Sequence, residues 1–394
     1  MSQRKTITAE PENSETPLES QAGWVTPNRL FFVRNHFPRP EIDLGAWRLS
    51  VEGGVRRPRL WTWEELNELP QRTVFATVEC AGNGRSFLHP SAAGVQWAAG
   101  AIGHAEWSGV PLRTVLEESG LEPAAMQILC QGADRGVEAD HPEPMHFERA
   151  LPLDKALHPD TLLALRMNGE PLEPDHGFPL RLFVPGWYGV ASVKWLVRIA
   201  ALDAPFGGYF QTTKYTVRRR PTATAGSTGL ETVVVGPMAV KSEILRPRSG
   251  EVLGLGPNRV VGLAWAGEEA VARVEISADG GYAWSPAELI GPRAPYSWRL
   301  FEATWRVDTP GDYTVLARAI SESGRMQPVE HDPLNGGYLI SFYRPTHVRV
   351  MATGRSDAQP GDWQALLYDM NAFAEENARR PLDVDLQFAA GAGI

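Results

Sequence analysis

The sequence predicts an α+β domain followed by an all-β sandwich of the immunoglobulin-like class. A chain of 394 residues is too long for a single hydrophobic core. Up to about residue 205, strand-like runs and short helical patterns mix without the regular period of a doubly wound sheet. From about Thr232 to Val350, apolar residues alternate with polar ones and turns recur about every ten residues, which is typical of a sandwich.

Composition changes along the chain set the predicted domain limits. The first residues are polar and acidic, which predicts disorder. A run with three arginines followed by Thr, Ala, Gly and Ser, at 218–230, predicts a linker or a long surface crossing. The predicted segments are a disordered leader at 1–23, the α+β domain at 24–230, the sandwich at 231–350, and a C-terminal extension at 351–394 with one amphipathic helix over Trp363–Glu375.

Individual elements follow from local signals. Thr62 is an N-cap residue before an acidic helical run, and period-two alternation marks the strands. An apolar run closed by proline leaves the polar Arg34, Asn35 and His36 at its end. Strands are predicted before Arg34 and over Trp47–Gly54, Thr73–Val78, Arg259–Trp265, Val271–Ser277, Phe301–Val307 and Tyr313–Ala319, and helices over Trp63–Leu69 and within Gly109–Glu118.

Charge and composition exclude several classes of function. The formal net charge of −9 argues against a nucleic-acid-binding surface, and an anionic ligand would need a local cluster of Arg and Lys. No run of eighteen apolar residues predicts a membrane span. The two cysteines do not form a disulfide framework. Because the first residues lack an apolar signal core, we expect a cytoplasmic protein, or a periplasmic one if an export signal is missing.

Cys80 is the candidate reactive residue. The predicted strand before it stops at Ala81-Gly82-Asn83-Gly84, so the thiol is expected at a sheet edge just before a sharp turn. A thiolate is a soft metal ligand or a nucleophile, and Arg85 supplies a positive field that favours the ionised form. The alternative is a small buried hydrophobic residue, the more common fate of a lone cysteine.

Six motifs, taken in order, resemble the sulfite oxidase family of molybdopterin-dependent oxidoreductases over roughly residues 24 to 350. The resemblance implies a molybdopterin-binding α+β domain of sulfite oxidase type, an immunoglobulin-like dimerisation domain after it, and a homodimer. The motifs are Phe32–His36, Cys80–Asn83, Gly132–Asp134, His176–Gly186, Ser192–Trp195 and Gln211–Tyr215.

The resemblance also implies roles for single residues. Cys80 would bind molybdenum, the hydroxyl of Tyr215 would point at the metal's oxo group, and Arg34 and Arg85 would attract the substrate oxyanion. Trp97 falls at the family's pocket tryptophan. An arginine such as Arg181 suits the phosphate of molybdopterin because it can bind two oxygens at once. The residues implied to hold the cofactor are Asn35, His36, Cys80, Asp134, His176, Arg181, Ser192, Val193 and Lys194.

Two departures from the family pattern bear on the substrate. Sulfite enzymes of the family usually follow Cys-Ala-Gly-Asn with two basic residues, whereas here Gly84 precedes Arg85. The segment matching the family's later substrate arginine contains Gly336 and Gly337 instead. Lys214, beside the motif tyrosine, is expected to compensate in part for these missing cations.

The resulting prediction is a molybdenum enzyme that oxidises sulfite to sulfate and passes the electrons to an external acceptor, for which a cytochrome is one candidate. A reductase of a sulfoxide or another oxoanion on the same cofactor is the first alternative. A cysteine hydrolase using Cys80 with His176, and a cofactor-free binding module, are alternatives from other classes. A visible spectrum and elemental analysis of the purified protein separate these classes.

Overall fold

The computed structural model describes residues 3–18, 23–220 and 229–352. Two five-stranded sheets form the N-terminal domain. The first has the order β11-β10-β7-β6, with β12 paired to β10, and the second has the order β5-β4-β13-β8-β9. The strands are β4 (Leu49–Gly53), β5 (Arg59–Trp61), β6 (Arg72–Glu79), β7 (Ile102–Pro111), β8 (Gln127–Glu138), β9 (His141–Pro152), β10 (Leu162–Met167), β11 (Glu170–Pro171), β12 (Arg181–Phe183) and β13 (Leu196–Leu202).

Short helices connect these strands and cover their faces. Apolar residues of α2 and of β13 share one buried cluster with Cys130, which the sequence predicts as strand core. The helices are α1 (Trp63–Glu68), α2 (Leu112–Ser119), α3 (Leu153–Ala156) and α4 (Tyr209–Thr212), with 3₁₀ turns η2 (Asn28–Leu30), η3 (Arg85–Phe87), η4 (Pro174–His176), η5 (Gly189–Ala191) and η6 (Pro333–Asn335). The predicted α+β character of this domain is therefore confirmed.

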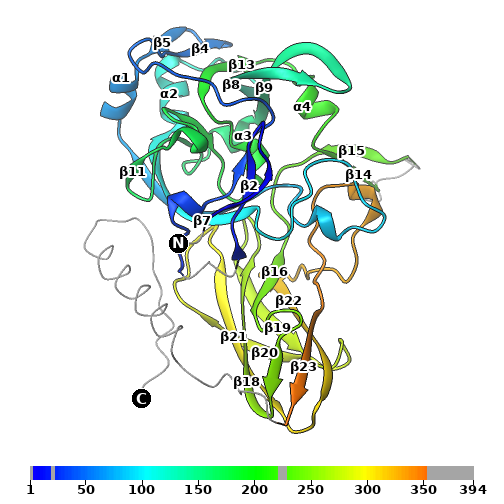
Figure 1. Cartoon of the computed structure of the whole chain (residues 1–394). Helices are drawn as coiled ribbons and strands as arrows, with labels where there is room; N and C mark the ends of the chain where they lie inside the picture. Colours follow the sequence, from blue (N-terminus) through cyan, green and yellow to red (C-terminus); the bar gives the residue numbers. More distant parts are fainter. Residues whose placement is uncertain (1–2, 19–22, 221–228, 353–394) are drawn as a thin grey trace.

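The second domain is built entirely from strands in the part of the chain described up to residue 352, apart from the turn η6. Its strands follow one path, β16-β18-β21-β20-β19-β22-β23-β17, around their own apolar core. They lie below the N-terminal domain in Figure 1. This arrangement is consistent with the predicted immunoglobulin-like sandwich. The strands are β16 (Lys241–Arg246), β17 (Val252–Gly254), β18 (Gly256–Trp265), β19 (Val271–Ser277), β20 (Ser285–Ile290), β21 (Arg299–Val307), β22 (Gly311–Ser321) and β23 (Thr346–Met351).

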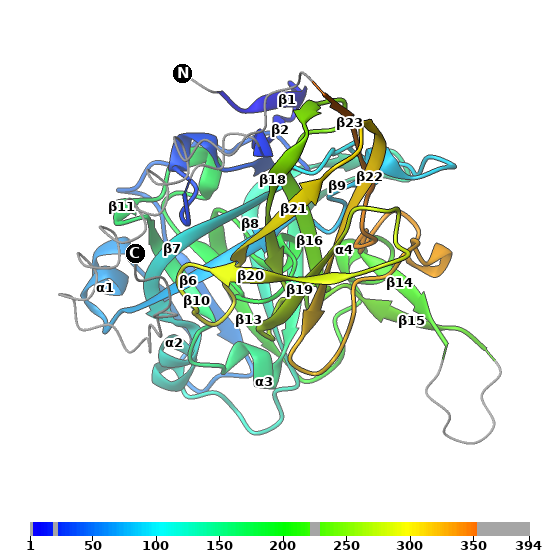
Figure 2. The ribbon, with the colours of Figure 1, turned by 90° about the horizontal axis from the view of Figure 1, so that it is seen from below.

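The segment predicted as a linker contains structure on both sides of its undescribed part. Strand β14 (Thr216–Arg219) pairs antiparallel with β15 (Glu231–Val234), so two of the three arginines belong to a strand. Figure 2 shows this ribbon at the edge of the molecule. Residues 221–228 and the predicted helix Trp363–Glu375 lie outside the described residues.

The prediction of a disordered leader is wrong for residues 3–18. Strands β1 (Lys5–Thr8) and β2 (Asn13–Glu15) form a hairpin that pairs with β3 (Val33–Arg34). Thr16 is buried and its hydroxyl donates to the carbonyl of Leu30 at 2.8 Å. The segment is ordered by hydrogen bonds to the folded domain, and its Ile7 and Leu18 pack against buried apolar clusters, so a composition-based expectation of disorder fails here.

Helix α1 begins with a reciprocal capping arrangement. The backbone N–H of Glu65 donates to the hydroxyl of Thr62 at 3.1 Å, and the Glu65 carboxylate accepts from the backbone N–H of Thr62 at 2.8 Å. Thr62 as N-cap, which the sequence predicts, is confirmed. The predicted helix within Gly109–Glu118 is confirmed with a later start, because β7 continues to Pro111.

Replacing Thr62 with alanine is expected to destabilise the protein by about 0.5 to 2 kcal/mol, because one N-terminal donor of α1 loses its partner. Urea unfolding, followed by circular dichroism, measures this change. Thr232→Ala, at an exposed position of β15, is the control and is expected to change stability by less than about 0.5 kcal/mol. Equal stability of the two variants would contradict the capping role.

Candidate functional site

Strand β6 delivers Cys80 to a tight turn at the edge of its sheet. The backbone N–H of Asn83 donates to the Cys80 carbonyl at 2.9 Å, and Gly84 closes the turn with a φ of 94°, a conformation that favours glycine. A Cβ at Gly82 would lie 2.2 Å from the Arg85 guanidinium. The turn therefore requires small residues, and it leaves the thiol of Cys80 on the wall of a cavity.

This cavity lies between the ends of several strands and turns. The cavity and its open mouth together comprise about 700 Å³ free of protein atoms, a volume that includes solvent at the mouth. Aromatic and aliphatic side chains form much of the wall, and a few charged groups converge on it. The lining residues are Phe31, Phe32, Arg34, Asn35, His36, Val78, Cys80, Asp134, Phe147, Asp175, His176, Arg181, Gly189, Val190, Ser192, Lys194, Trp195 and Tyr215.

Arg34 and Tyr215 meet on one side of this cavity. Arg34 Nη2 donates to the Tyr215 hydroxyl at 3.5 Å, and the same hydroxyl shares a 2.7 Å hydrogen bond with His36 Nε2. Tyr215 has a φ of 55°, which turns its ring back toward the cavity. Burial raises the pKa of Tyr215 to about 12 although Arg34 opposes the shift, so the phenol stays protonated at neutral pH and can donate a hydrogen bond.

His36 is held as a neutral ring. It stacks on Phe147 with 4.7 Å between ring centroids and also contacts Phe210. Burial, and then the positive charge of Arg34, lower its pKa well below the usual value. A neutral imidazole beside Tyr215 orients the phenol without adding another cation to the cavity.

Asp134 and Lys194 also line the cavity. A Cβ at Gly132 would lie 2.4 Å from Asp134 Oδ1, so the glycine before the aspartate leaves room for this carboxylate. Lys194 donates to the Asn35 side chain, and to the backbone carbonyl of Asp175 at 2.9 Å. Burial raises the pKa of Asp134 and lowers that of Lys194, because each charge has left water.

Two buried polar atoms test whether a cofactor fits here. Asp134 Oδ1 and Arg181 Nε have no hydrogen-bond partner among the described residues. Arg181 also donates to the carbonyls of His176 at 3.0 Å and Ser192 at 3.2 Å, and burial lowers its pKa to about 9. Buried polar groups are normally satisfied, so an acceptor and a donor left without partners at a cavity fit a polar ligand such as a pterin with its phosphate.

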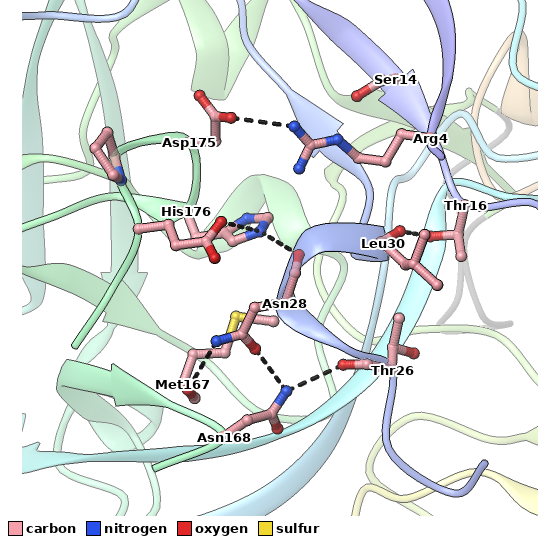
Figure 3. Close-up of polar contacts among 12 residues, drawn as sticks. Arg4, Ser14, Thr16, Thr26, Asn28, Leu30, Met167, Asn168, Asp175 and His176 are labelled. Atoms are coloured by element: carbon pink, nitrogen blue, oxygen red, sulfur yellow. Dashed lines mark hydrogen bonds and ion pairs between the residues drawn. The ribbon is translucent and has the colours of Figure 1, made fainter. Parts of the chain in front are cut away.

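His176 does not have the geometry of a base for Cys80. Its Nε2 bonds to the carbonyl of Asn28 at 3.1 Å, and Figure 3 shows this contact beside η2. Burial lowers the pKa of His176 to about 3, so the ring is neutral at physiological pH. A neutral ring turned toward a carbonyl does not stabilise a thiolate, which disfavours the cysteine hydrolase alternative.

Four of the residues predicted for the site lie away from the described lining of the cavity: Arg85, Trp97, Val193 and Lys214. Arg85 turns over the cysteine loop and donates to the carbonyl of Gly337 at 2.8 and 3.0 Å and to that of Val95 at 2.8 Å. Lys214 pairs with Asp140 at 3.0 Å, on the rim of α4 and β8. Trp97 and Val193 are fully buried.

Comparison with known proteins agrees with this geometry. Residues 36–210 match the family model for an oxidoreductase molybdopterin-binding domain, and residues 233–344 match a Mo-co oxidoreductase dimerisation domain. Sulfite oxidase from Gallus gallus is 36% identical over 336 residues, which cover 82% of this chain and 72% of that protein. The chain belongs to the sulfite oxidase family.

Two further similar proteins are a longer mitochondrial enzyme and a protein of known structure. Mitochondrial sulfite oxidase from Drosophila melanogaster is 34% identical over 374 residues, covering 88% of this chain and 63% of that protein. The chain thus spans less than two thirds of the length of this relative. The crystal structure of the sulfane dehydrogenase SoxCD from Paracoccus pantotrophus is 29% identical, with a TM-score of 0.75, and covers 90% of this chain and 89% of that one.

The family motifs predict most, but not all, of the cavity wall. Arg34 ends β3 and is followed by Asn35 and His36. The other predicted residues on the wall include Asp134, His176, Arg181, Ser192 and Lys194. Sequence reasoning missed the apolar wall of Phe31, Val78, Phe147 and Val190, and the acidic Asp175. Asp175 could have been predicted because it is adjacent to His176 in the sequence, whereas no local sequence feature indicates Phe147.

Proposed function

We propose that this chain is a molybdopterin-dependent oxidoreductase that oxidises a small sulfur oxoanion, with sulfite as the first candidate. One observation carries the proposal: the Cys80 thiol, the Arg34 guanidinium and the Tyr215 hydroxyl line one cavity. A soft thiolate, an anion-binding cation and a protonated donor are the three groups that such a reaction needs from a protein. The matching family domains support the same conclusion.

The residues that would hold the cofactor are Cys80 at the metal and Asp134, Arg181 and Lys194 around the pterin and its phosphate. When bound, the molybdenum group supplies oxygen-atom transfer and accepts two electrons. Cys80 supplies the thiolate ligand from a turn whose backbone is fixed by the carbonyl contacts of Asn83 and Arg85. Asp134 and Arg181 offer the unpartnered acceptor and donor noted above.

The side chains near Cys80 would act on the substrate. Arg34 attracts and orients the oxyanion, and the protonated Tyr215 donates a hydrogen bond to an oxygen that gains negative charge. Phe31, Phe32 and Val190 keep the surroundings poor in water, which strengthens both interactions. In the overall reaction, sulfite and water give sulfate, two protons and two electrons, and the electrons pass to an external acceptor.

Replacing Arg34 with glutamine in the holoenzyme tests the proposal. The variant is expected to lose about 10- to 150-fold in kcat/KM for sulfite, because a hydrogen bond to a charged group contributes roughly 1.5 to 3 kcal/mol. Steady-state assays with ferricyanide as acceptor measure this change. Arg198→Gln is the control, since Arg198 pairs with Glu52 at 2.7 Å on the second sheet and does not line the cavity.

A wild-type enzyme that retains molybdenum but does not oxidise sulfite would contradict the sulfite assignment. The alternative reductase would instead consume a reduced dye in the presence of a sulfoxide or another oxoanion. Unchanged kcat/KM in Arg34→Gln with full molybdenum content would exclude Arg34 from substrate binding.

Sulfane sulfur is the second candidate substrate, and two observations favour it. Arg85 is engaged by the carbonyls of Gly337 and Val95, and the family arginine expected near Gly336 is absent, so the cavity is poorer in cations than the sulfite pattern implies. The structure of the sulfane dehydrogenase SoxCD matches nine tenths of the chain. Parallel assays with sulfite and with a protein-bound or small-molecule sulfane distinguish the two substrates.

We also propose that the chain works as a homodimer, since its C-terminal region matches a dimerisation-domain family. Sedimentation of the purified protein tests this proposal. A cytochrome stays a candidate for the electron acceptor. Location in the cytoplasm stays a prediction, because the names of the animal relatives place them in mitochondria. No helix in the described ranges is long and apolar enough to cross a membrane.

A further inference from the structure

The N-terminal hairpin contacts Arg34 through a buried asparagine. Asn13 lies on β2 opposite Arg34 of β3, and it is only 2% exposed. Its carboxamide oxygen accepts from Arg34 Nη1 at 3.2 Å and from the backbone N–H of Asn35 at 3.0 Å. One side-chain atom thus fixes both the guanidinium and the backbone that carries it.

The amide group of Asn13 is fixed from its other end as well. Its Nδ2 donates to the hydroxyl of Thr8 at 2.8 Å and to the carbonyl of Pro11 at 3.0 Å. The backbone N–H of Asn35 can only donate and the carbonyl of Pro11 can only accept, so the partners themselves determine which end of the amide is oxygen. The hydrogen bonds leave Asn13 no freedom to turn away from Arg34.

A second contact joins the same hairpin to Asp175, which lines the cavity. Arg4 Nη2 pairs with Asp175 Oδ2 at 3.1 Å, while Arg39 pairs with Asp175 Oδ1 at 2.5 Å. Figure 3 shows Arg4 extending from the hairpin to Asp175, next to His176. The hairpin is therefore fastened to the cavity wall at Arg34 and at Asp175.

The neutral amide of Asn13 can hold Arg34 in place without neutralising the charge that would bind an anionic ligand. In the described part of the chain, Arg34 forms no ion pair with a carboxylate within 4.0 Å, and its Nη1 contacts are the neutral oxygens of Asn13 and of the Asn35 backbone. A carboxylate at the position of Asn13 would hold Arg34 equally well but would cancel its charge. A neutral amide restricts the long side chain and leaves its charge for the ligand.

We propose that Asn13 is the positioning residue for Arg34, so that the hairpin of residues 3–16 is part of the anion-binding site. The inference rests on the proposed role of Arg34 in binding the substrate oxyanion. It assigns a specificity role to a segment whose composition predicts only a disordered leader.

Asn13→Asp preserves size and both acceptor contacts and places a negative charge beside Arg34, while the donor contacts to Thr8 and Pro11 are lost. In the holoenzyme, KM for sulfite is expected to rise at least tenfold while kcat stays within twofold of wild type. Lys5→Ala is the matched control in the same hairpin, since Lys5 pairs with Glu15 at 3.1 Å and its side chain is 66% exposed. The control is expected to keep the wild-type KM.

Sulfate provides a readout that needs no turnover. The shift in thermal unfolding caused by sulfate, relative to chloride at equal ionic strength, is expected in the wild type and in Lys5→Ala and is expected to be lost in Arg34→Gln and Asn13→Asp. If Asn13→Asp yields little folded protein, Asn13→Ser replaces it, and a raised KM and reduced sulfate shift are expected there too.

The outcomes separate this inference from the proposed function. If sulfite is not oxidised but the sulfate shift depends on Arg34 and on Asn13, the positioning role stands and the sulfite assignment fails. If Arg34→Gln alters KM and the sulfate shift but the Asn13 variants do not, the positioning role is overturned and the function stands. Three further results would overturn the positioning role of Asn13. The first is a raised KM and a lost sulfate shift in Lys5→Ala as well. The others are Asn13 variants in which kcat and molybdenum content fall without a change in KM, and a sulfate shift that does not depend on Arg34.

Discussion

Cys80→Ser is expected to remove the visible absorption of the purified enzyme, to lower its molybdenum content and to reduce sulfite oxidation by more than about 100-fold. Loss of even an outer partner of a metal ligand costs roughly 10- to 100-fold, and this substitution removes the proposed ligand itself. A serine oxygen is a harder donor than a thiolate and gives up less electron density to the metal. Cys80 directly follows β6, lines the cavity and is only 6% exposed, and serine is close to cysteine in size, so the substitution is expected to preserve the surrounding fold.

The chain supplies a matched control for this substitution. Cys130 is fully buried in β8, and burial raises the pKa of its thiol to about 12, so it stays a neutral apolar side chain. Cys130→Ala is expected to lower stability by creating a small cavity while leaving the absorption and metal content unchanged. Elemental analysis and the visible spectrum of both variants test whether Cys80 binds the metal. Retention of the absorption band and the metal in Cys80→Ser would refute thiolate ligation.

Lys241→Met is expected to destabilise the protein by about 3 to 5 kcal/mol, because it leaves a buried carboxylate without its cation. Lys241, the first residue of β16 in the sandwich, pairs with Glu79 at 3.0 Å, and the side chains are 3% and 2% exposed. Asn83 Nδ2 donates to Glu79 Oε1 at 3.0 Å and Trp265 Nε1 donates to Glu79 Oε2 at 2.9 Å. Glu79 directly precedes Cys80, so this network joins the sandwich to the base of the cysteine turn.

A neutral replacement of both partners distinguishes an unpaired charge from a simple loss of packing. Adding Glu79→Gln to Lys241→Met is expected to recover much of the lost stability, since no charge is then buried alone. Chemical unfolding of the single and double variants measures this recovery. The control is Arg259→Met: Arg259 pairs with Glu302 at 2.6 Å, but both are 25% exposed, so about 1 kcal/mol or less is expected. Equal losses in Lys241→Met and Arg259→Met would show that the ion pair of Lys241 is unimportant.

Features with local causes were predictable. The capping role of Thr62 depends on a residue three positions away, and the turn after Cys80 depends on adjacent small residues. The strands of the sandwich have one buried and one exposed face, and this arrangement produces an alternation of apolar and polar residues that can be recognised in the sequence. The family motifs likewise predicted that β3, the cysteine turn and the segments around Asp134 and Arg181 line one site.

Features that depend on distant partners were not predictable. Arg85 closely follows Cys80 in sequence, yet its guanidinium donates to a carbonyl 252 positions away and is not among the residues that line the cavity. Lys214 is adjacent to Tyr215, but the positive φ of Tyr215 turns the tyrosine inward while Lys214 pairs with Asp140 on the rim. A residue next to a motif has its backbone near the site, but its long side chain can extend to partners elsewhere.

The sequence by itself determined the fold class, the cysteine turn and most of the segments that line the cavity, because turn residues, strand alternation and family motifs act over short distances. Only the tertiary structure showed that the polar N-terminal hairpin contacts Arg34 and Asp175 on the cavity wall, and that Lys241 of the sandwich pairs with Glu79 beside the cysteine turn. Both depend on buried polar groups that are stable only when a partner from elsewhere in the chain satisfies them, and composition does not identify that partner.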